Sequence, residues 1–138
     1  MLWTVPARRM KAKLEHRVPL SPRALEILKQ AKLLSGDSPL VFPGRKEGKP
    51  MGNMVFLVAL RRMNVEATAH GFRSSFRDWA AETTSNPREL AEMALAHTIE
   101  SKVKAAYRRG DLLERRRALM QEWADYGSPE APSQAGQP

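Results

Sequence analysis

The sequence predicts a mainly α-helical fold with a small β-hairpin at its N-terminal end. Beyond residue 20, apolar residues recur at helical spacing along most of the chain. Several of these stretches begin with residues that favour helix starts. Only the first twenty residues contain two short β-prone segments. A chain of 138 residues fits one domain with a real core, and we find no internal repeat and no sign of a second domain.

The β-hairpin is predicted from two segments, residues 2–5 (Leu-Trp-Thr-Val) and residues 16–20 (His-Arg-Val-Pro-Leu). The polar, basic stretch between them, residues 7–15, is long for a tight hairpin connection. We therefore expect this loop to reach toward a ligand rather than to fill a core.

The middle of the chain predicts two helices separated by a turn. Ser21 and Pro22 favour a helix start, and Gly36 marks the end of that helix. Residues 40–43 form a short apolar segment that suggests an edge strand, and residues 44–50 form a polar, basic turn. A second helix is expected to begin at Asn53.

A third helix is predicted to begin at Thr68 or His70. It would carry four apolar residues on one face, which we expect to form core: Phe72, Phe76, Trp79 and Ala80. A fourth helix should begin at residues 86–89 (Asn-Pro-Arg-Glu), with Asn86 as the N-cap, and end near residues 96–97.

Two further helices are predicted before a disordered tail. Thr98 can cap a helix that runs to about Arg109, and Asp111 with Glu114 can begin the last one, through about Tyr126. Residues 127–138 are rich in Pro, Ser, Gly and Gln, which favours disorder. Residues 1–126 would therefore be one folded domain.

The charge points to a polyanionic partner. Lys and Arg total 23 against 15 Asp and Glu, which gives a net charge of +8 and a pI near 10.3. Such a balance favours nucleic acid or an acidic membrane face as the partner. The basic residues cluster in residues 1–20 and 101–120, so two regions could contact a phosphate backbone. From these clusters we select as DNA-binding candidates Arg8, Arg9, Lys13, Arg17, Lys102, Lys104 and Arg108.

Several function classes are disfavoured by composition. No apolar run is long enough for a membrane span, and residues 1–20 do not resemble a secretory signal. Cysteine is absent, which excludes disulfides and thiolate–metal sites and is compatible with a reducing cytoplasm.

Five residues carry the chemistry that the sequence suggests. His70 and Arg73 are three residues apart, so on a helix they share a face. His97 lies at a helix junction, Tyr107 follows ten residues later in a basic segment, and Lys11 lies in the hairpin loop. Each is commonplace alone, since a lone His, an amphipathic-helix Tyr and a loop Lys are usually structural or solvated.

In combination these residues resemble the signature of tyrosine recombinases, and most closely that of phage and genomic-island integrases. The segment 69–73 (Ala-His-Gly-Phe-Arg) is similar to the family's box of that sequence. Leu95-Ala96-His97, followed by Tyr107, is similar to its L-A-H box and tyrosine helix. The hairpin strands and the segments 41–43 and 123–126 also match, so the resemblance covers residues 3–126 in the family's order.

The resemblance implies the catalytic-domain fold of DNA breaking-rejoining enzymes, N-terminally incomplete, and it implies site-specific DNA recombination. Tyr107 would attack a DNA phosphate to give a 3′-phosphotyrosyl link, while Arg73 and His97 hold the non-bridging oxygens. His70 would accept the tyrosine proton, and Lys11 would protonate the leaving 5′-oxygen, with Lys13 as its rival. The family needs no metal and no other cofactor.

The sequence departs from the family pattern before its hairpin. The family carries another essential Arg in a T-G-x-R-x-x-E segment and an N-terminal DNA-binding domain, and neither precedes Met1. We therefore expect either a part of a longer integrase or a shortened relict.

Partners follow from the same resemblance. They are double-stranded DNA attachment sites and further protomers assembled on them, with no membrane and no small-molecule substrate, in a bacterial cytoplasm. The last helix commonly docks onto a neighbouring protomer. Its docking face here, which could equally be intramolecular core, would comprise Leu112, Leu113, Leu119, Met120 and Trp123.

Other functions stay open. A non-catalytic DNA-binding remnant would use the same basic clusters and is supported by the absent Arg. A type IB topoisomerase would use similar residues, although the integrase-like hairpin and L-A-H box argue against it. A metal-dependent hydrolase built on His70 and His97 is the weakest alternative, because the chain has three His, no Cys and no H-E-x-x-H spacing.

Overall fold

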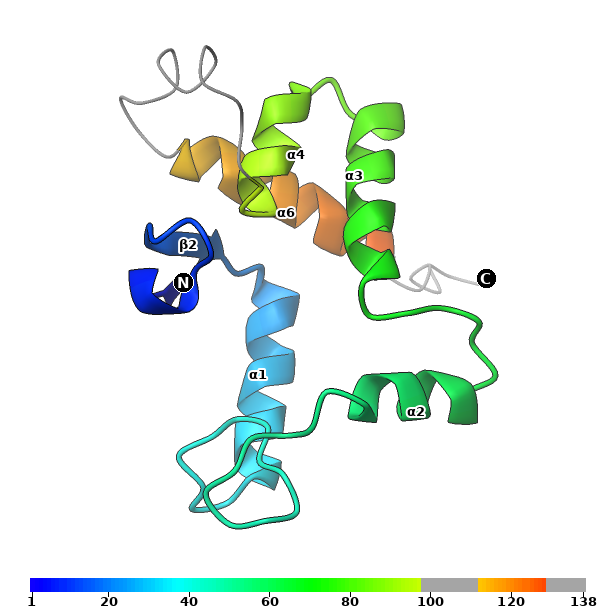
Figure 1. Cartoon of the computed structure of the whole chain (residues 1–138). Coiled ribbons are helices and arrows are strands. Elements are labelled where there is room, and N and C mark those ends of the chain that lie inside the picture. The colour runs from blue at the N-terminus through cyan, green and yellow to red at the C-terminus, as the bar shows by residue number, and fades with distance from the viewer. Residues whose placement is uncertain (98–111, 129–138) are drawn as a thin grey trace, which may run out of the picture.

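The computed structural model describes residues 1–97 and 112–128, which form a mainly helical chain with one two-stranded antiparallel sheet (Figure 1). The fold class predicted from the sequence is confirmed at this level. The elements are β1 (Leu2–Val5), a short 3-10 helix (Ala7–Arg9), β2 (His16–Pro19), α1 (Pro22–Leu34), α2 (Val55–Arg62), α3 (Gly71–Thr83), α4 (Arg88–Ala94) and α6 (Leu113–Gly127).

The hairpin forms at the predicted place. β1 pairs antiparallel with β2, in a register that sets Leu2 opposite Pro19 and Val5 opposite His16. The connection contains the 3-10 turn, and Lys13 adopts a left-handed backbone with φ of 55°. The loop is therefore ordered by local turns rather than by a longer ladder.

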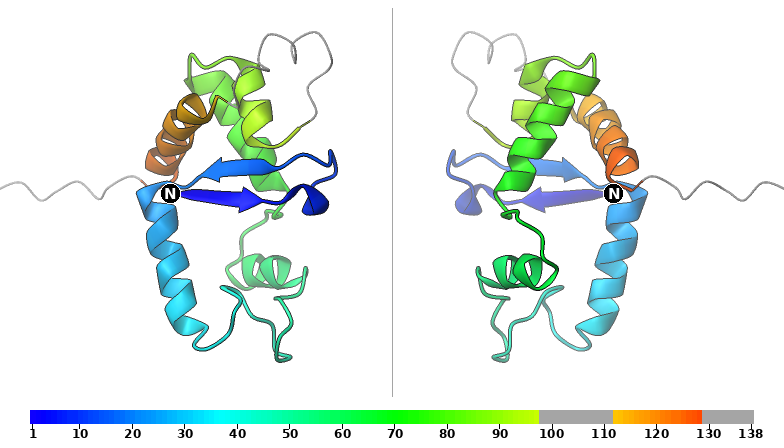
Figure 2. Two further views of the ribbon diagram at one scale, coloured as in Figure 1. Left: turned by 90° about the vertical axis from the view of Figure 1, so that its left-hand side faces the viewer. Right: turned by 90° about the vertical axis from the view of Figure 1, so that its right-hand side faces the viewer.

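Helix α1 starts as its sequence predicts. The Ser21 Oγ accepts a hydrogen bond from the Ala24 amide at 3.2 Å, and Pro22 occupies the first helical position. No residue of α1 is buried, and none of α2 is either. Figure 2 shows that α1 leads away from the hairpin toward the loop that connects it to α2. These two helices lie at some distance from the group formed by α3, α4 and α6.

Several predicted boundaries are corrected. Residues 40–43 form no strand, only an isolated bridge between Pro43 and Pro50, because proline has no amide hydrogen to extend a ladder. Helix α2 begins at Val55 rather than at Asn53. Helix α4 takes Pro87 rather than Asn86 as its N-cap, and Leu112, with φ of 48°, precedes α6. The predicted helix 98–109, Asp111 and residues 129–138 of the predicted tail lie outside the described residues.

The core lies between α3, α4 and α6. The predicted face of α3 is confirmed for Phe76, Trp79 and Ala80, which are buried, whereas Phe72 is 54% exposed. Phe76 and Trp79 pack against Trp123 of α6, with ring centroids 5.5 and 5.1 Å apart. Aromatic packing thus ties α6 to α3.

The apolar face of α6 is part of this core. Leu119 is completely buried, and Leu112, Met120 and Trp123 pack against the buried cluster, while Leu113 is half-buried. The alternative of intramolecular core is therefore confirmed for Leu112, Leu119, Met120 and Trp123. Docking of this helix onto another protomer stays a prediction.

A buried arginine joins α6 to the hairpin. Arg116 is only 2% exposed, and its Nη1 donates a hydrogen bond of 2.8 Å to the backbone oxygen of Arg17 in β2. Burial of an arginine costs free energy unless its N–H groups are hydrogen-bonded. The contact with Arg17 therefore favours one position of the hairpin against α6. The hairpin is thereby fixed beside α6 despite its small share of the core.

Replacing Arg116 with methionine should loosen the hairpin. Because the buried hydrogen bond from Arg116 to the Arg17 carbonyl would be lost, we expect the free energy of unfolding to fall by about 1–3 kcal/mol in urea denaturation. The matched change Arg115→Met, at an exposed position of the same helix, should cost about 0.5 kcal/mol or less. Equal effects of the two changes would show that the buried contact does not stabilise the fold.

Candidate functional site

Two of the predicted site residues, Arg73 and His97, meet in space. Arg73 lies in the first turn of α3, and His97 follows α4, 24 positions later. Arg73 Nη2 lies 2.8 Å from His97 Nε2 and also donates to the backbone oxygen of Leu95 at 2.7 Å. Both side chains are exposed enough to receive a ligand. The packing of α3 against α4 therefore brings a guanidinium and an imidazole to one point.

The turn that ends α4 presents His97 at this point. Ala96 adopts a left-handed backbone with φ of 56°. The Ala96 amide then donates to the Met93 oxygen at 3.1 Å, and the His97 amide donates to the Glu92 oxygen at 2.9 Å. This pair of hydrogen bonds is the Schellman motif, which reverses the chain at a helix end. In a left-handed backbone the Cβ of alanine lies too close to a carbonyl oxygen, so Ala96 carries steric strain that glycine would avoid.

A carboxylate stands on the other side of the histidine ring. Glu92 Oε2 contacts His97 Nδ1, and the Glu92 side chain is only 17% exposed. The hydrogen bond from His97 is the main cause that lowers the pKa of the Glu92 carboxyl below its ordinary value. Burial opposes the lowering, and the charges of Arg77, of Arg88 and of His97 when it is protonated add to it. Glu92 is therefore ionised near neutral pH and can only accept hydrogen bonds.

The hairpin loop lies next to His97. A cavity of about 230 Å³ is lined from the hairpin by residues that include Met10 and Ala12. On its other side lie Met93 of α4, His97 in the turn that follows, and Arg116 of α6. Lys11 sits between two of these lining residues and is exposed. The structure thus brings the loop that carries Lys11 to the same side of the fold as His97.

The other predicted catalytic residues are placed less fully. His70 is exposed and directly precedes α3, three residues before Arg73. Its side chain caps no amide of this helix; instead the Thr68 Oγ1 accepts from the Gly71 amide at 3.0 Å. Tyr107 lies outside the described residues.

The predicted DNA-binding residues of the hairpin are mostly accessible. Arg8 and Arg9 are exposed in the 3-10 turn, and Lys13 is exposed in the loop. Arg17 is half-buried in β2. The other predicted residues of this kind, Lys102, Lys104 and Arg108, fall in the segment that the structure does not describe.

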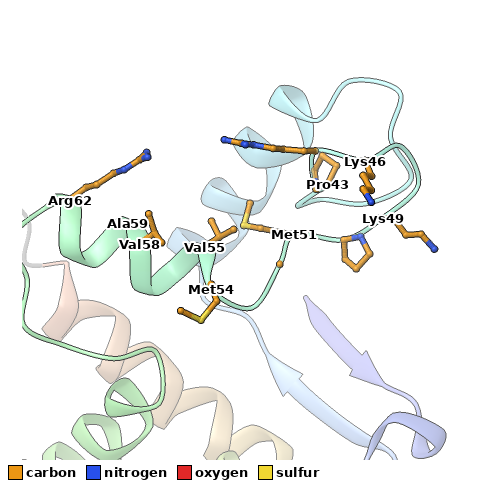
Figure 3. A pocket seen from close by; sticks show the side chains of 13 residues that line it. Pro43, Lys46, Lys49, Met51, Met54, Val55, Val58, Ala59 and Arg62 are labelled. Atoms are coloured by element: carbon orange, nitrogen blue, oxygen red, sulfur yellow. The ribbon is translucent and has the colours of Figure 1, made fainter.

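A second cationic surface lies around α2. Figure 3 shows a groove between this helix and the turn of residues 43–50. Its cavity measures about 650 Å³ and has an apolar floor that includes Val55 and Val58. Among the described residues, four cationic side chains and no acidic one line this cavity: Arg45, Lys46, Lys49 and Arg62.

Within residues 1–97 and 112–128, no group of three or more His, Asp and Glu side chains could hold a metal ion. No helix in the same part of the chain is long and apolar enough to cross a bilayer.

Three features of the site and its surroundings were not predicted from the sequence. Glu92 could have been noticed as a carboxylate that precedes His97 by five residues. The groove cations could have been suspected from the basic turn followed by Arg61-Arg62. Arg116 lies four residues after Leu112 and three before Leu119, so helical spacing could have indicated that it shares their buried face.

Comparison with known proteins finds integrases. The chain is 42% identical to the prophage integrase IntA of Escherichia coli over 126 residues, which cover 89% of this chain and 30% of that protein. It is 38% identical to the integrase of Enterobacteria phage P4 and 32% identical to the integrase of Shigella phage Sf6, with 91% and 89% of this chain and 33% of each relative covered. The chain thus spans about one third of the length of these relatives. No protein-family model and no solved structure matches it.

Exchanging Ala96 for glycine should stabilise the turn after α4. Glycine adopts the left-handed backbone without a clashing Cβ, so we expect the free energy of unfolding to rise by about 0.5–1 kcal/mol in chemical denaturation. The control Ala94→Gly, in the last helical position of α4, should lower it by about 1 kcal/mol. A loss of stability in both variants would contradict the strained turn.

Proposed function

Because the chain belongs to the phage integrase family, we propose that it carries the phosphate-binding and strand-cleaving residues of a tyrosine-type, site-specific DNA recombinase. The observation that carries the proposal is the meeting of Arg73 in α3 with His97 in the turn after α4, at 2.8 Å. The reaction would take place on double-stranded DNA in the bacterial cytoplasm, within an assembly of several protomers.

Arg73 and His97 would hold the scissile phosphate. A phosphodiester is already negative, and further charge develops on its non-bridging oxygens during attack at phosphorus. The guanidinium offers several N–H donors in a planar fork, and only Nη2 is engaged by Leu95 and His97. Among the described residues, the other N–H groups of Arg73 have no hydrogen-bond partner and could bind phosphate oxygens.

Tyr107 would be the nucleophile. Its oxygen attacks phosphorus, the bond to the 5′-oxygen breaks, and a 3′-phosphotyrosyl link forms. A tyrosine hydroxyl has a pKa near 10 and needs a base, a role that we assign to His70. Lys11 would give its proton to the departing 5′-oxygen, with Lys13 as the alternative. The phosphotyrosine conserves the ester bond, so the reverse attack by a 5′-hydroxyl rejoins DNA without ATP.

The duplex would be held by the basic surfaces around this centre. The hairpin contributes Arg8, Arg9, Lys13 and Arg17, and the segment near Tyr107 contributes Lys102, Lys104 and Arg108. The groove around α2 adds a further cationic surface, with Lys46 and Lys49 on the turn that faces the helix (Figure 3). Such contacts position the duplex through its backbone, whatever its base sequence.

The nucleophile is tested with the two tyrosines of the chain. A nicked suicide duplex that carries the attachment site should trap the protein covalently, as a shifted band on a denaturing gel. Tyr107→Phe should abolish the adduct, because phenylalanine lacks the attacking oxygen. Tyr126→Phe should keep it, since Tyr126 packs through its ring on Trp79 and Trp123. An adduct with Tyr107→Phe would refute the role, and salt-dependent binding without any adduct in the unaltered chain would favour the DNA-binding remnant.

The groove is tested by the salt dependence of duplex binding. Lys46→Gln should weaken binding and reduce the slope of log affinity against log salt by about 1, because one fewer counterion is released. Lys29→Gln, which removes an exposed lysine from α1 outside the groove, is the matched control and should leave the slope nearly unchanged. Equal slopes for the two variants would remove the groove from the DNA interface.

A further inference from the structure

Both ring nitrogens of His97 are engaged in a way that fixes the position of its proton. Glu92 Oε2 contacts Nδ1, and an ionised carboxylate only accepts, so Nδ1 carries the hydrogen. Arg73 Nη2 lies 2.8 Å from Nε2, and a guanidinium only donates, so Nε2 presents its lone pair. These two contacts together fit a neutral imidazole with the hydrogen on Nδ1.

This tautomer cannot donate to a phosphate oxygen from Nε2. The lone pair on Nε2 would face the lone pairs of an anionic oxygen. The other nitrogen cannot help, because it is turned to Glu92. For Nε2 to donate, the ring must gain a proton and become an imidazolium, with Glu92 still accepting from Nδ1.

We propose that Glu92 is a positioning residue that holds His97 for proton-coupled phosphate binding: the site takes up one proton when a DNA phosphodiester enters between Arg73 and His97. The inference rests on the proposed function, since it needs the phosphate of the DNA backbone at this point. The only bond formed is N–H at Nε2, and the proton comes from solvent.

The charges of the cluster favour this uptake. Without ligand, the cationic Arg73, the neutral His97 and the anionic Glu92 sum to zero. A phosphodiester adds one negative charge, and protonation of His97 restores the balance. In the free site the same proton would set an imidazolium directly against the guanidinium at 2.8 Å, which is repulsive. Phosphate between the two cations removes this repulsion.

Other ionisable groups surround His97 and must be separated from it in a test. Arg73 faces it from α3, and Glu92 faces it from α4, with Arg77 and Arg88 acting on Glu92. Across the small cavity lie Glu15, His16 and Arg17 of the hairpin and Arg116 of α6. His16 is the other group on this list that ordinarily titrates between pH 5 and 8, so substitution of His97 itself is needed.

The number of protons taken up is measured by isothermal titration calorimetry. A short duplex of random sequence is titrated into the full chain near pH 7.5, in two buffers that differ in ionisation enthalpy. We expect an uptake of about one proton per bound chain, and an affinity that rises by up to about tenfold for each unit by which the pH falls. In Glu92→Gln and His97→Gln the uptake should nearly vanish and the affinity should become almost independent of pH.

Glu82→Gln is the matched control, because it removes an exposed carboxylate from α3 and should keep the uptake of the unaltered chain. A purely structural role of Glu92 would weaken binding at every pH alike and leave the proton count unchanged. Unchanged uptake in Glu92→Gln or His97→Gln would overturn the inference.

A second measurement needs no Glu92 variant. The ¹⁵N shifts of the His97 ring, assigned by comparison with His97→Gln, should show hydrogen on Nδ1 alone in the free chain and on both nitrogens with the duplex. Hydrogen on Nε2 alone in the free chain would overturn the inference. Binding without proton uptake would overturn the inference and leave the proposed function standing. Absence of any duplex binding would overturn the proposed function, and the inference with it.

Discussion

The site depends on one backbone feature, the left-handed turn at Ala96 that ends α4. Two hydrogen bonds from Ala96 and His97 close this turn onto the last residues of the helix. The reversal sets the Leu95 oxygen and the His97 ring side by side, and Arg73 of α3 contacts both through Nη2. The same guanidinium therefore donates a hydrogen bond to a carbonyl at the end of α4 and also contacts His97. Strain at Ala96 is offset by the core beneath it, where Leu90 and Ala91 of α4 are buried.

The turn at Ala96 also determines how the charged groups around His97 are arranged. The chain is strongly basic, yet its centre is locally balanced, because Glu92 stands behind His97 and its lowered pKa keeps it ionised. An anionic ligand can then be bound without leaving an imidazolium unpaired. Around the centre, the basic hairpin is held to α6 by the buried Arg116. The packing of three helices thus places a local Arg–His–Glu cluster inside a wider cationic surface suited to a nucleic-acid backbone.

The sequence predicted those parts of the fold that depend on local signals. The hairpin, the Ser21 cap and the aromatic face of α3 could be predicted because strand propensity, capping and periodicity act within a few residues. The edge strand at residues 40–43 was wrong because strand formation needs a partner, and proline leaves only a single bridge. The role of α6 as core, the burial of Arg116 and the Glu92–His97 contact depend on tertiary packing, so a single sequence could not decide them.

The most direct test of the central claim is the position of a DNA phosphate relative to Arg73 and His97, measured by crystallography of the chain with a duplex. We expect a backbone phosphate within hydrogen-bonding distance of both side chains, with the Arg73–His97 contact opened to admit it and the contact between Arg73 and the Leu95 oxygen retained. A duplex bound elsewhere, with the Arg73–His97 contact intact and no phosphate beside it, would contradict the account.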